Sequence, residues 1–226
     1  MLDGTGLGWV GHVIKAQPAA RSAYERMLAD PAFLAPIRWS QIRASDLDTL
    51  VLPGGHAREM KPYLESEVLQ SIVRTCLDAD KTVAAICHGV LIAAWAKGDD
   101  GRSVLADRRC TTLPGMVENI GWRLTRKRMG DDYFKLYEET AEQVVRSSLG
   151  DEGVFLSGPR LLRPDTADKP GFVVVDGNLI TARYPGDAHG FARAVVNDLN
   201  ERRRSVASTP IVSAADVKRG LSARAH

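Results

Sequence analysis

The neighbouring residues Cys87 and His88 are the clearest candidates for chemistry in this sequence, because a thiol and an imidazole side by side can act as a nucleophile and its acid/base partner. The pair follows the apolar run TVAAI at 82–86, which is typical of a buried strand, and precedes VLIAAWAK at 90–97, which is typical of a helix. A strand, a sharp turn and a helix in this order predict a nucleophile elbow. The sulfur would lie at the carboxyl edge of a sheet, where open α/β sheets bind ligands, and the amides of the following helix would favour its thiolate form.

Three other segments predict the elements that position this elbow. The run TLVLP at 49–53 is typical of a buried parallel strand, and Pro53-Gly54-Gly55 ends it in a tight loop. Residues 66–81 have helical spacing, with Ser66 as the N-cap. Residues 172–183 form two β runs around Asp176-Gly177, a dipeptide favoured in hairpins. Strands that alternate with helices predict an α/β fold around a mostly parallel sheet.

The remaining elements have weaker signals. Residues 19–30 have helical spacing that Pro31 closes, and residues 104–113 contain a possible strand. Helices are predicted at 115–125, at 138–149 and at 188–203. We expect a single domain over residues 1–204 and a basic C-terminal tail over residues 205–226.

Composition excludes several classes of protein. The chain has 226 residues, of which 44% are hydrophobic and 26% charged, so global disorder, a collagen and a coiled coil are disfavoured. The longest apolar runs are far shorter than the ~18–20 residues that cross a bilayer, and no export signal is visible, so no membrane association is expected. A net charge of +2 gives no general reason for nucleic-acid binding, which we regard as unlikely.

The three cysteines have different settings. Because Cys76, Cys87 and Cys110 cannot all pair within one chain, a disulfide framework is not expected, and the default compartment is the reducing cytoplasm. Cys76 lies on the apolar face of a predicted helix, and Cys110 lies in a predicted strand, so both are interpreted as packed, inert residues. Only Cys87 has an elbow around it.

These motifs resemble the ThiJ/PfpI family of the class I glutamine amidotransferase-like superfamily. The resemblance rests on AICHG at the elbow, on LVLPGG about thirty residues earlier, and on the closing run DGNLITARYPGDAHGFA. The longer phrases PGGHAREMKPYLES and AAICHGVL are similar to the larger, amidotransferase-like branch of the family. The resemblance covers roughly residues 46–200 and implies a flavodoxin-like sheet sandwiched by helices.

The resemblance also implies roles for individual residues. Cys87 would be the nucleophile and His88 its acid/base neighbour. The backbone amides of Gly55 and His88 would form the oxyanion hole, and Gly54 and Gly55 would let their loop approach the reacting carbonyl. Apart from the resemblance, the position of His56 directly after the double glycine makes it a candidate for the wall of the substrate pocket.

The third member of a catalytic triad is left open. Glu118 lies about where related families place an acid after the elbow, although a solvated carboxylate in the first turn of a helix is the simpler interpretation. Asp187 and His189, at the start of the last helix, are a second option, although Asp187 also fits an N-cap.

The sequence departs from the family before the Pro53-Gly54-Gly55 loop. Family members begin with a strand, a helix and a second strand, and the first strand supplies a glutamate beside the cysteine; no residue here matches that acid, and 1–13 does not have the pattern of that strand. A sheet without this strand would leave a buried edge unpaired. Three outcomes are open: a partner chain fills the gap, the early segment takes the place of the strand, or the chain is unstable alone. We expect the first, in the form of a homodimer.

Two classes of function follow. The first is a cysteine-dependent hydrolase or lyase that acts on a small carbonyl compound or amide, such as a glyoxalase III-like or deglycase enzyme. A glutaminase is less favoured, because its C-terminal H-x-E is absent and 189–191 reads H-G-F. The second is a stress-response chaperone or redox sensor, or a degenerate amidotransferase-like domain. Neither class needs a cofactor, and the five histidines show no metal-ligand spacing.

Overall fold

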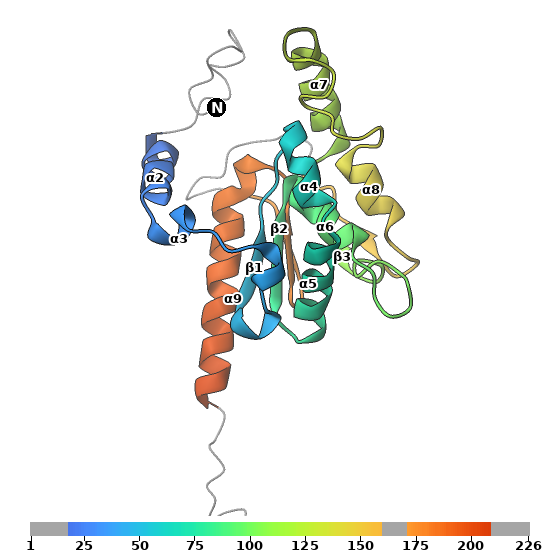
Figure 1. The fold of residues 1–226 in the computed structure, drawn as a ribbon. Coiled ribbons are helices and arrows are strands. Elements are labelled where there is room, and N and C mark those ends of the chain that lie inside the picture. Colours follow the sequence, from blue (N-terminus) through green and yellow to red (C-terminus); the bar gives the residue numbers. More distant parts are fainter. Residues whose placement is uncertain (1–17, 160–170, 209–226) are drawn as a thin grey trace, which may run out of the picture.

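The computed structural model describes residues 18–159 and 171–208. Its centre is a four-stranded sheet in the order β1-β2-β6-β5, in which the first three strands are parallel and β5 is antiparallel to β6 (Figure 1). The strands are β1 (Thr49–Leu52), β2 (Thr82–Ile86), β5 (Val173–Asp176) and β6 (Leu179–Ala182). The predicted flavodoxin-like α/β architecture, a mostly parallel sheet flanked by helices and closed by a C-terminal hairpin, is confirmed.

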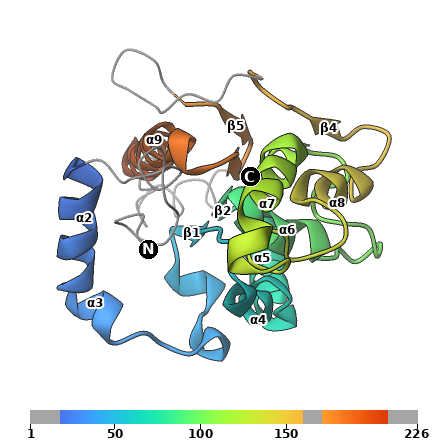
Figure 2. The same ribbon diagram turned by 90° about the horizontal axis from the view of Figure 1, so that it is seen from above.

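Helices cover both faces of this sheet. Helices α5 (Glu67–Asp78) and α6 (Val90–Trp95) lie on one face, and the long α9 (Ala188–Ser208) lies on the other (Figures 1 and 2). The other helices are α2 (Pro18–Leu28), α3 (Pro31–Leu34), α4 (Lys61–Leu64), α7 (Gly115–Met129) and α8 (Ala141–Ser147). The strands β3 (Arg109–Cys110) and β4 (Val154–Phe155) form a separate, parallel two-stranded sheet.

Alternating side chains of β2 fill two cores. Val83 and Ala85 belong to the larger cluster with α5, α6 and α8, whereas Ala84 packs with Ile180 and Phe191 on the α9 side. This alternation is the two-residue period of a strand, and it explains why a run that is apolar on both sides is buried at its first four positions. Full burial of each large aliphatic side chain contributes about 1.5–3 kcal/mol, so the cores hold the sheet edge that carries the elbow in place.

The strongest local signals predicted the structure well. Ser66 caps α5, because its Oγ accepts a hydrogen bond from Leu69 N at 3.3 Å. The predicted hairpin is present, and Gly177 has a φ of +58° in its turn, a conformation that glycine adopts without a steric cost. The Asn178 amide donates to the carbonyls of Leu77 and Lys81, which ties this turn to the end of α5.

Several predicted boundaries were wrong. The first helix ends at Leu28, and Pro31 opens α3 instead of only closing its predecessor, because proline is well tolerated at the first position of a helix. Only Arg109–Cys110 of the strand predicted at 104–113 is a strand. Helix α7 continues four residues past the predicted 125 to Met129, and α8 is shorter at both ends than predicted.

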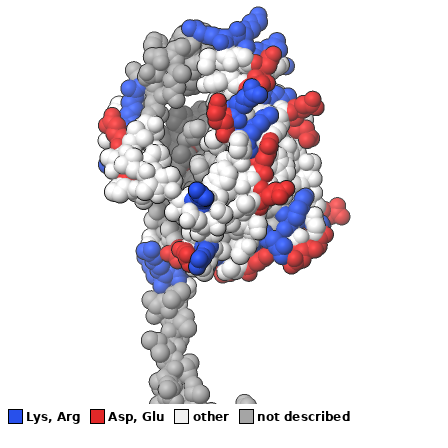
Figure 3. Space-filling model, viewed as in Figure 1, with Lys and Arg blue, Asp and Glu red and all other residues white. Residues whose placement is uncertain are grey.

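The surface carries both signs of charge. Figure 3 shows Lys and Arg gathered over α7, whose last turn contains Arg126, Lys127 and Arg128. Helix α9 runs through residue 204, where the domain was predicted to end, to Ser208. The glycine-rich start and residues 209–226 of the basic tail lie outside the described residues. Among the described helices, none has the length and hydropathy needed to span a membrane.

Candidate functional site

Cys87 begins a short 3₁₀ turn, Cys87–Gly89, between β2 and α6. Its φ is +58°, in the left-handed region that residues with a Cβ atom rarely adopt. Such a conformation costs on the order of 1–3 kcal/mol and persists only where the surrounding structure imposes it. The predicted sharp turn between strand and helix is therefore present, and it carries backbone strain at the cysteine itself.

Two glycines allow the loop after β1 to pack against this turn. A Cβ atom on Gly89 would lie 2.3 Å from the Leu52 carbonyl oxygen, and one on Gly54 would lie 2.6 Å from Cys87 Cβ and 2.7 Å from His88 N. Larger residues would push the two segments apart, which explains the glycine at both positions. Gly55 is also crowded, but by the Met60 side chain, whose Cγ would lie 2.9 Å from an added Cβ.

Cys87, His88 and Glu118 form a chain of contacts. The Cys87 sulfur lies 3.6 Å from His88 Nδ1, and His88 Nε2 lies 3.5 Å from Glu118 Oε1. Both charged side chains are only 1% exposed, so the Glu118 carboxylate is buried and not solvated. Its other oxygen accepts a hydrogen bond from Ala141 N at 2.9 Å, and α7 and the start of α8 together hold the acid in place.

The contact between His88 and Glu118 is an ion pair with a long distance and not a well-formed hydrogen bond. Within the described residues, His88 Nε2 is a buried nitrogen without a hydrogen-bond partner. Burial alone lowers the pKa of His88, but the hydrogen bond and charge of Cys87, together with Glu118, outweigh it and raise the pKa to about 9.

Thr112 is a contact of the elbow that the sequence analysis missed. Its side chain is fully buried, and its Oγ1 donates a hydrogen bond to the Cys87 carbonyl oxygen at 2.8 Å. Nothing in the local sequence singles out this threonine, because its partner is 25 residues earlier in the chain. The bond anchors the peptide group that follows the strained cysteine.

His56 lies in an aromatic environment. Its Nδ1 is 2.9 Å from the Tyr133 carbonyl oxygen, and its ring stacks on Phe134 with a centroid distance of 4.1 Å. Burial lowers the pKa of His56, and the nearby charge of His88 lowers it further. His56 is thus a neutral ring held by the segment that follows α7, consistent with a wall beside the elbow.

The alternative acid, Asp187, is engaged elsewhere. Its carboxylate is fully buried and accepts hydrogen bonds from Arg183 at 2.8 and 3.1 Å and from Phe172 N at 2.9 Å. These bonds hold the carboxylate between Arg183 and Phe172, at the two ends of the hairpin, directly before α9 begins at Ala188. His189 is exposed on α9.

The other two cysteines differ from Cys87. Cys76 and Cys110 are fully buried, whereas Cys87 is partly exposed, and all three are free. Burial raises the pKa of Cys76, and it raises that of Cys110 to about 12, so both remain neutral thiols. Across residues 18–159 and 171–208, no cluster of three His, Cys, Asp or Glu side chains could hold a metal ion.

Comparison with solved structures supports the fold. A structure described as APC35852 matches with a TM-score of 0.61 and 24% identity, over 83% of this chain and 72% of that one. Glyoxalase III from Candida albicans matches with a TM-score of 0.59 and 20% identity, over 77% of this chain and 69% of that one. At these identities the likeness establishes the fold alone.

Comparison with known sequences identifies the family. Protein DJ-1 homolog D from Arabidopsis thaliana is 30% identical over 156 residues, which are 68% of this chain but only 28% of that protein. Deglycase PfpI from Pyrococcus furiosus is 27% identical over 162 residues, 71% of this chain and 67% of that one. A sequence profile described as the DJ-1/PfpI family matches residues 12–198. With the elbow and the sheet that carries it, this match shows that the chain belongs to the DJ-1/PfpI family.

Proposed function

We propose that this protein is a cysteine-dependent enzyme that converts a small carbonyl compound, with a glyoxalase III-like or deglycase activity. The observation that carries the proposal is the contact of Cys87, a partly exposed residue at a strained elbow, with His88. The Cys87 sulfur lies 3.6 Å from an imidazole whose other nitrogen faces the buried Glu118. A thiolate, an acid/base and an orienting carboxylate are the groups that nucleophilic catalysis at a carbonyl requires.

With methylglyoxal, the proposed reaction balances without a cofactor. The Cys87 thiolate adds to the aldehyde carbon, so that a C–S bond forms and the carbonyl oxygen takes the negative charge. The aldehyde carbon is then oxidised to a thioester while the neighbouring ketone is reduced to an alcohol. Water cleaves the C–S bond, releases lactate and returns the thiol, and the sum is methylglyoxal plus water giving lactate.

The protein groups have separate roles in this scheme. His88 would hold and return the protons, and Glu118 would keep the imidazole oriented and charged. We propose that the backbone amides of Gly55 and His88 stabilise the oxyanion. Gly54, which has no side chain, lets the loop after β1 pack against the elbow. His56, stacked on Phe134, would form one wall of the pocket.

The similar proteins support the substrate class. Deglycase PfpI and Deglycase TK1284 from Thermococcus kodakarensis, 27% identical each, carry the name of a deglycase. Because the chain spans only 28% of the Arabidopsis relative, the activity of that whole protein is not transferred.

The experiment is lactate formation from methylglyoxal by the wild type and by Cys87→Ser. We expect turnover by the wild type and none above background by the variant. Cys76→Ser is the matched control, because it changes a buried thiol that has no imidazole partner, and it should retain turnover in the fraction that folds. Equal rates with Cys87→Ser and wild type would exclude the cysteine mechanism.

A wild type without turnover of methylglyoxal or of a glycated amino acid would favour the other class, a redox sensor or chaperone. Peroxide treatment followed by mass spectrometry distinguishes these cases. A sensor would form a sulfenic acid at Cys87 with the two buried cysteines unchanged.

We also propose that the protein is a homodimer in the cytoplasm, with a single domain up to the basic tail. Strand β1 is the edge of the described sheet, and Val51 on this strand is 49% exposed. Exposed strand edges are templates for pairing with another chain, which supports a dimer. The free cysteines support a reducing compartment. Light scattering at micromolar concentration should give twice the 24.6 kDa chain mass, and a monomer would contradict the dimer.

A further inference from the structure

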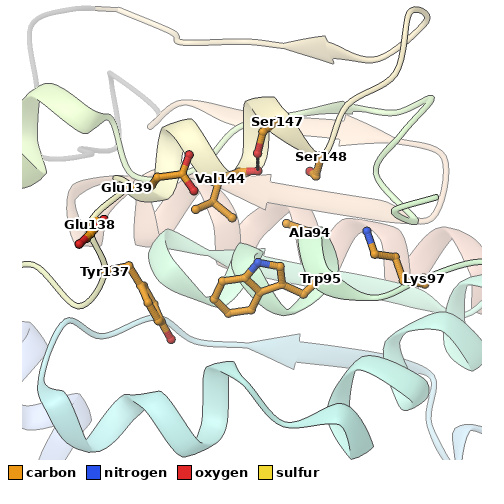
Figure 4. Close-up of a pocket in the computed structure, with 9 residues that line it drawn as sticks. All are labelled: Ala94, Trp95, Lys97, Tyr137, Glu138, Glu139, Val144, Ser147 and Ser148. Atoms are coloured by element: carbon orange, nitrogen blue, oxygen red, sulfur yellow. Dashed lines mark hydrogen bonds between the residues drawn. The ribbon is translucent and has the colours of Figure 1, made fainter. Parts of the chain in front are cut away.

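A pocket lies at the C-terminal end of α6, away from Cys87, which precedes the N-terminal end of this helix (Figure 4). Its volume is about 460 Å³, which is within the range of small-molecule sites. None of the residues that line it belongs to the Cys87 site. The pocket is therefore unexplained by the proposed activity.

The walls of this pocket are aromatic and fixed. Trp95 and Tyr137 meet edge to face with a centroid distance of 5.4 Å. The Tyr137 hydroxyl donates to Glu65 at 3.0 Å, and Lys61 Nζ lies 5.2 Å from the Tyr137 ring centre. Both contacts hold the ring in place before any ligand binds, and buried Ala94 adds apolar surface beside Trp95.

The charges around this pocket have opposite signs at its two ends. Glu138 and Glu139 lie at one end and Lys97 at the other, with the Trp95 ring between them (Figure 4). In the part of the chain that the structure describes, these three side chains make no ion pair with each other or with a neighbour. Nearby charged residues do pair, as Arg146 does with Glu142 at 2.8 Å. Lys97 and the two glutamates are therefore available to a ligand that carries both signs of charge.

We propose that this pocket binds a small molecule with a cationic group at one end, a carboxylate at the other and an apolar stem between them. A basic amino acid such as arginine has this chemistry. Its guanidinium group would face Glu138 and Glu139 and contact the Trp95 ring, and its carboxylate would face Lys97. The stem would cover Ala94 and Val144.

Calorimetric titration of the full chain with L-arginine tests this proposal. Agmatine lacks the carboxylate, and citrulline lacks the side-chain charge, so each should bind at least about tenfold more weakly than arginine if each end contributes a charge-assisted contact. Equal binding of either analogue would overturn the two-ended site. No heat of binding with arginine at about 10 mM would overturn the pocket as a site for this class.

Two variants of the pocket and two controls locate the binding. The double variant Glu138→Gln/Glu139→Gln and the single variant Lys97→Met should each weaken arginine binding by at least about tenfold, while the exposed control Glu152→Gln should bind as the wild type does. Cys87→Ser should also bind arginine normally, which separates this site from the proposed catalytic one. Unchanged affinity in the Glu and Lys variants would place the binding elsewhere and overturn the assignment.

Discussion

Two buried ion pairs in this molecule have opposite characters. Arg183 and Asp187, 4% and 0% exposed, make two close hydrogen bonds to each other. Arg183 also donates to the Pro159 carbonyl at 2.8 Å, so its guanidinium is well satisfied. His88 and Glu118, each 1% exposed, meet at 3.5 Å with His88 Nε2 lacking a proper hydrogen bond.

The difference fits a structural role for the first pair and the proposed catalytic role for the second. The Arg183–Asp187 pair holds the segment after β6 against Phe172. Its guanidinium and carboxylate groups are occupied by hydrogen bonds within the fold. The His88–Glu118 pair is incompletely bonded and ends at a partly exposed thiol. Incomplete bonding in a buried pair is costly, and a functional site is where such a cost is expected.

Substitution of Cys87 by Ser should have the largest effect and should act on activity alone. Loss of the nucleophile should lower carbonyl turnover by at least about 10⁴-fold, because no other described thiol has an imidazole beside it. The free energy of unfolding should change by less than about 1 kcal/mol, since the side chain is partly exposed. Steady-state kinetics and urea unfolding of one preparation check both, and a large loss of stability would mean that Cys87 is structural.

Substitution of Asp187 by Ala should lower the stability of the fold and not the activity of the molecules that remain folded. Removal of one partner leaves a buried, uncompensated Arg183, which costs about 3–5 kcal/mol of unfolding free energy. The double variant Asp187→Ala/Arg183→Met removes the orphaned charge and should recover part of that loss. If Asp187→Ala unfolds at the wild-type urea midpoint, the ion pair does not stabilise the fold.

Substitution of Glu118 by Gln should affect activity more than stability. The amide keeps the shape and can still accept from Ala141 N, but it removes the charge that helps to raise the pKa of His88. We expect turnover to fall by about 100-fold and the pH profile to change, because the imidazole is then less readily protonated. Glu142→Gln, which changes a surface pair on α8, is the control. An unchanged pH profile would exclude Glu118 as the orienting acid.

The protonation of His88 should appear in the stability of the fold. Its pKa is raised from 6.5 to about 9 on folding, so the folded state binds the proton more tightly than the unfolded state. This contribution is fully present below pH 6.5 and is lost as the pH rises through about 9. The difference in unfolding free energy between wild type and His88→Gln should therefore decrease as the pH rises from 6.5 to about 9. A difference that is flat or that rises with pH would contradict a protonated His88.

Substitution of Thr112 by Val should have the smallest effect. It leaves the Cys87 carbonyl without its 2.8 Å hydrogen bond, at a cost of about 1–3 kcal/mol. Turnover should fall about tenfold because the elbow is less firmly held, whereas Thr112→Ser, which retains the hydroxyl, should recover it. Equal activity of the Val and Ser variants would show that the hydroxyl does not position the cysteine.

Local patterns predicted the elements that hold the site. The apolar runs of β1 and β2, the Ser66 cap and the hairpin around Gly177 depend on contacts within a few residues or on burial in a sheet, and both leave a signal in sequence. Pro31 shows the limit of such signals, because the same residue type ends one helix and begins another.

Long-range contacts in the site could not be predicted in the same way. Glu118 fits a solvated helix turn by its local sequence, and only the packing of α7 against α8 buries it beside His88. Thr112 contacts Cys87, a residue 25 positions earlier in the chain. In each case the partner lies on a separate element or turn whose placement depends on tertiary packing.

Selective alkylation is the most direct test of the reactive cysteine. The folded protein is treated with limiting iodoacetamide at neutral pH, and the labelled peptides are quantified by mass spectrometry for the wild type and for His88→Gln. We predict that Cys87 is labelled well before the buried Cys76 and Cys110, and that labelling slows when the imidazole is removed. Labelling of all three cysteines at similar rates, or a Cys87 rate unchanged in His88→Gln, would contradict an activated thiol at the elbow.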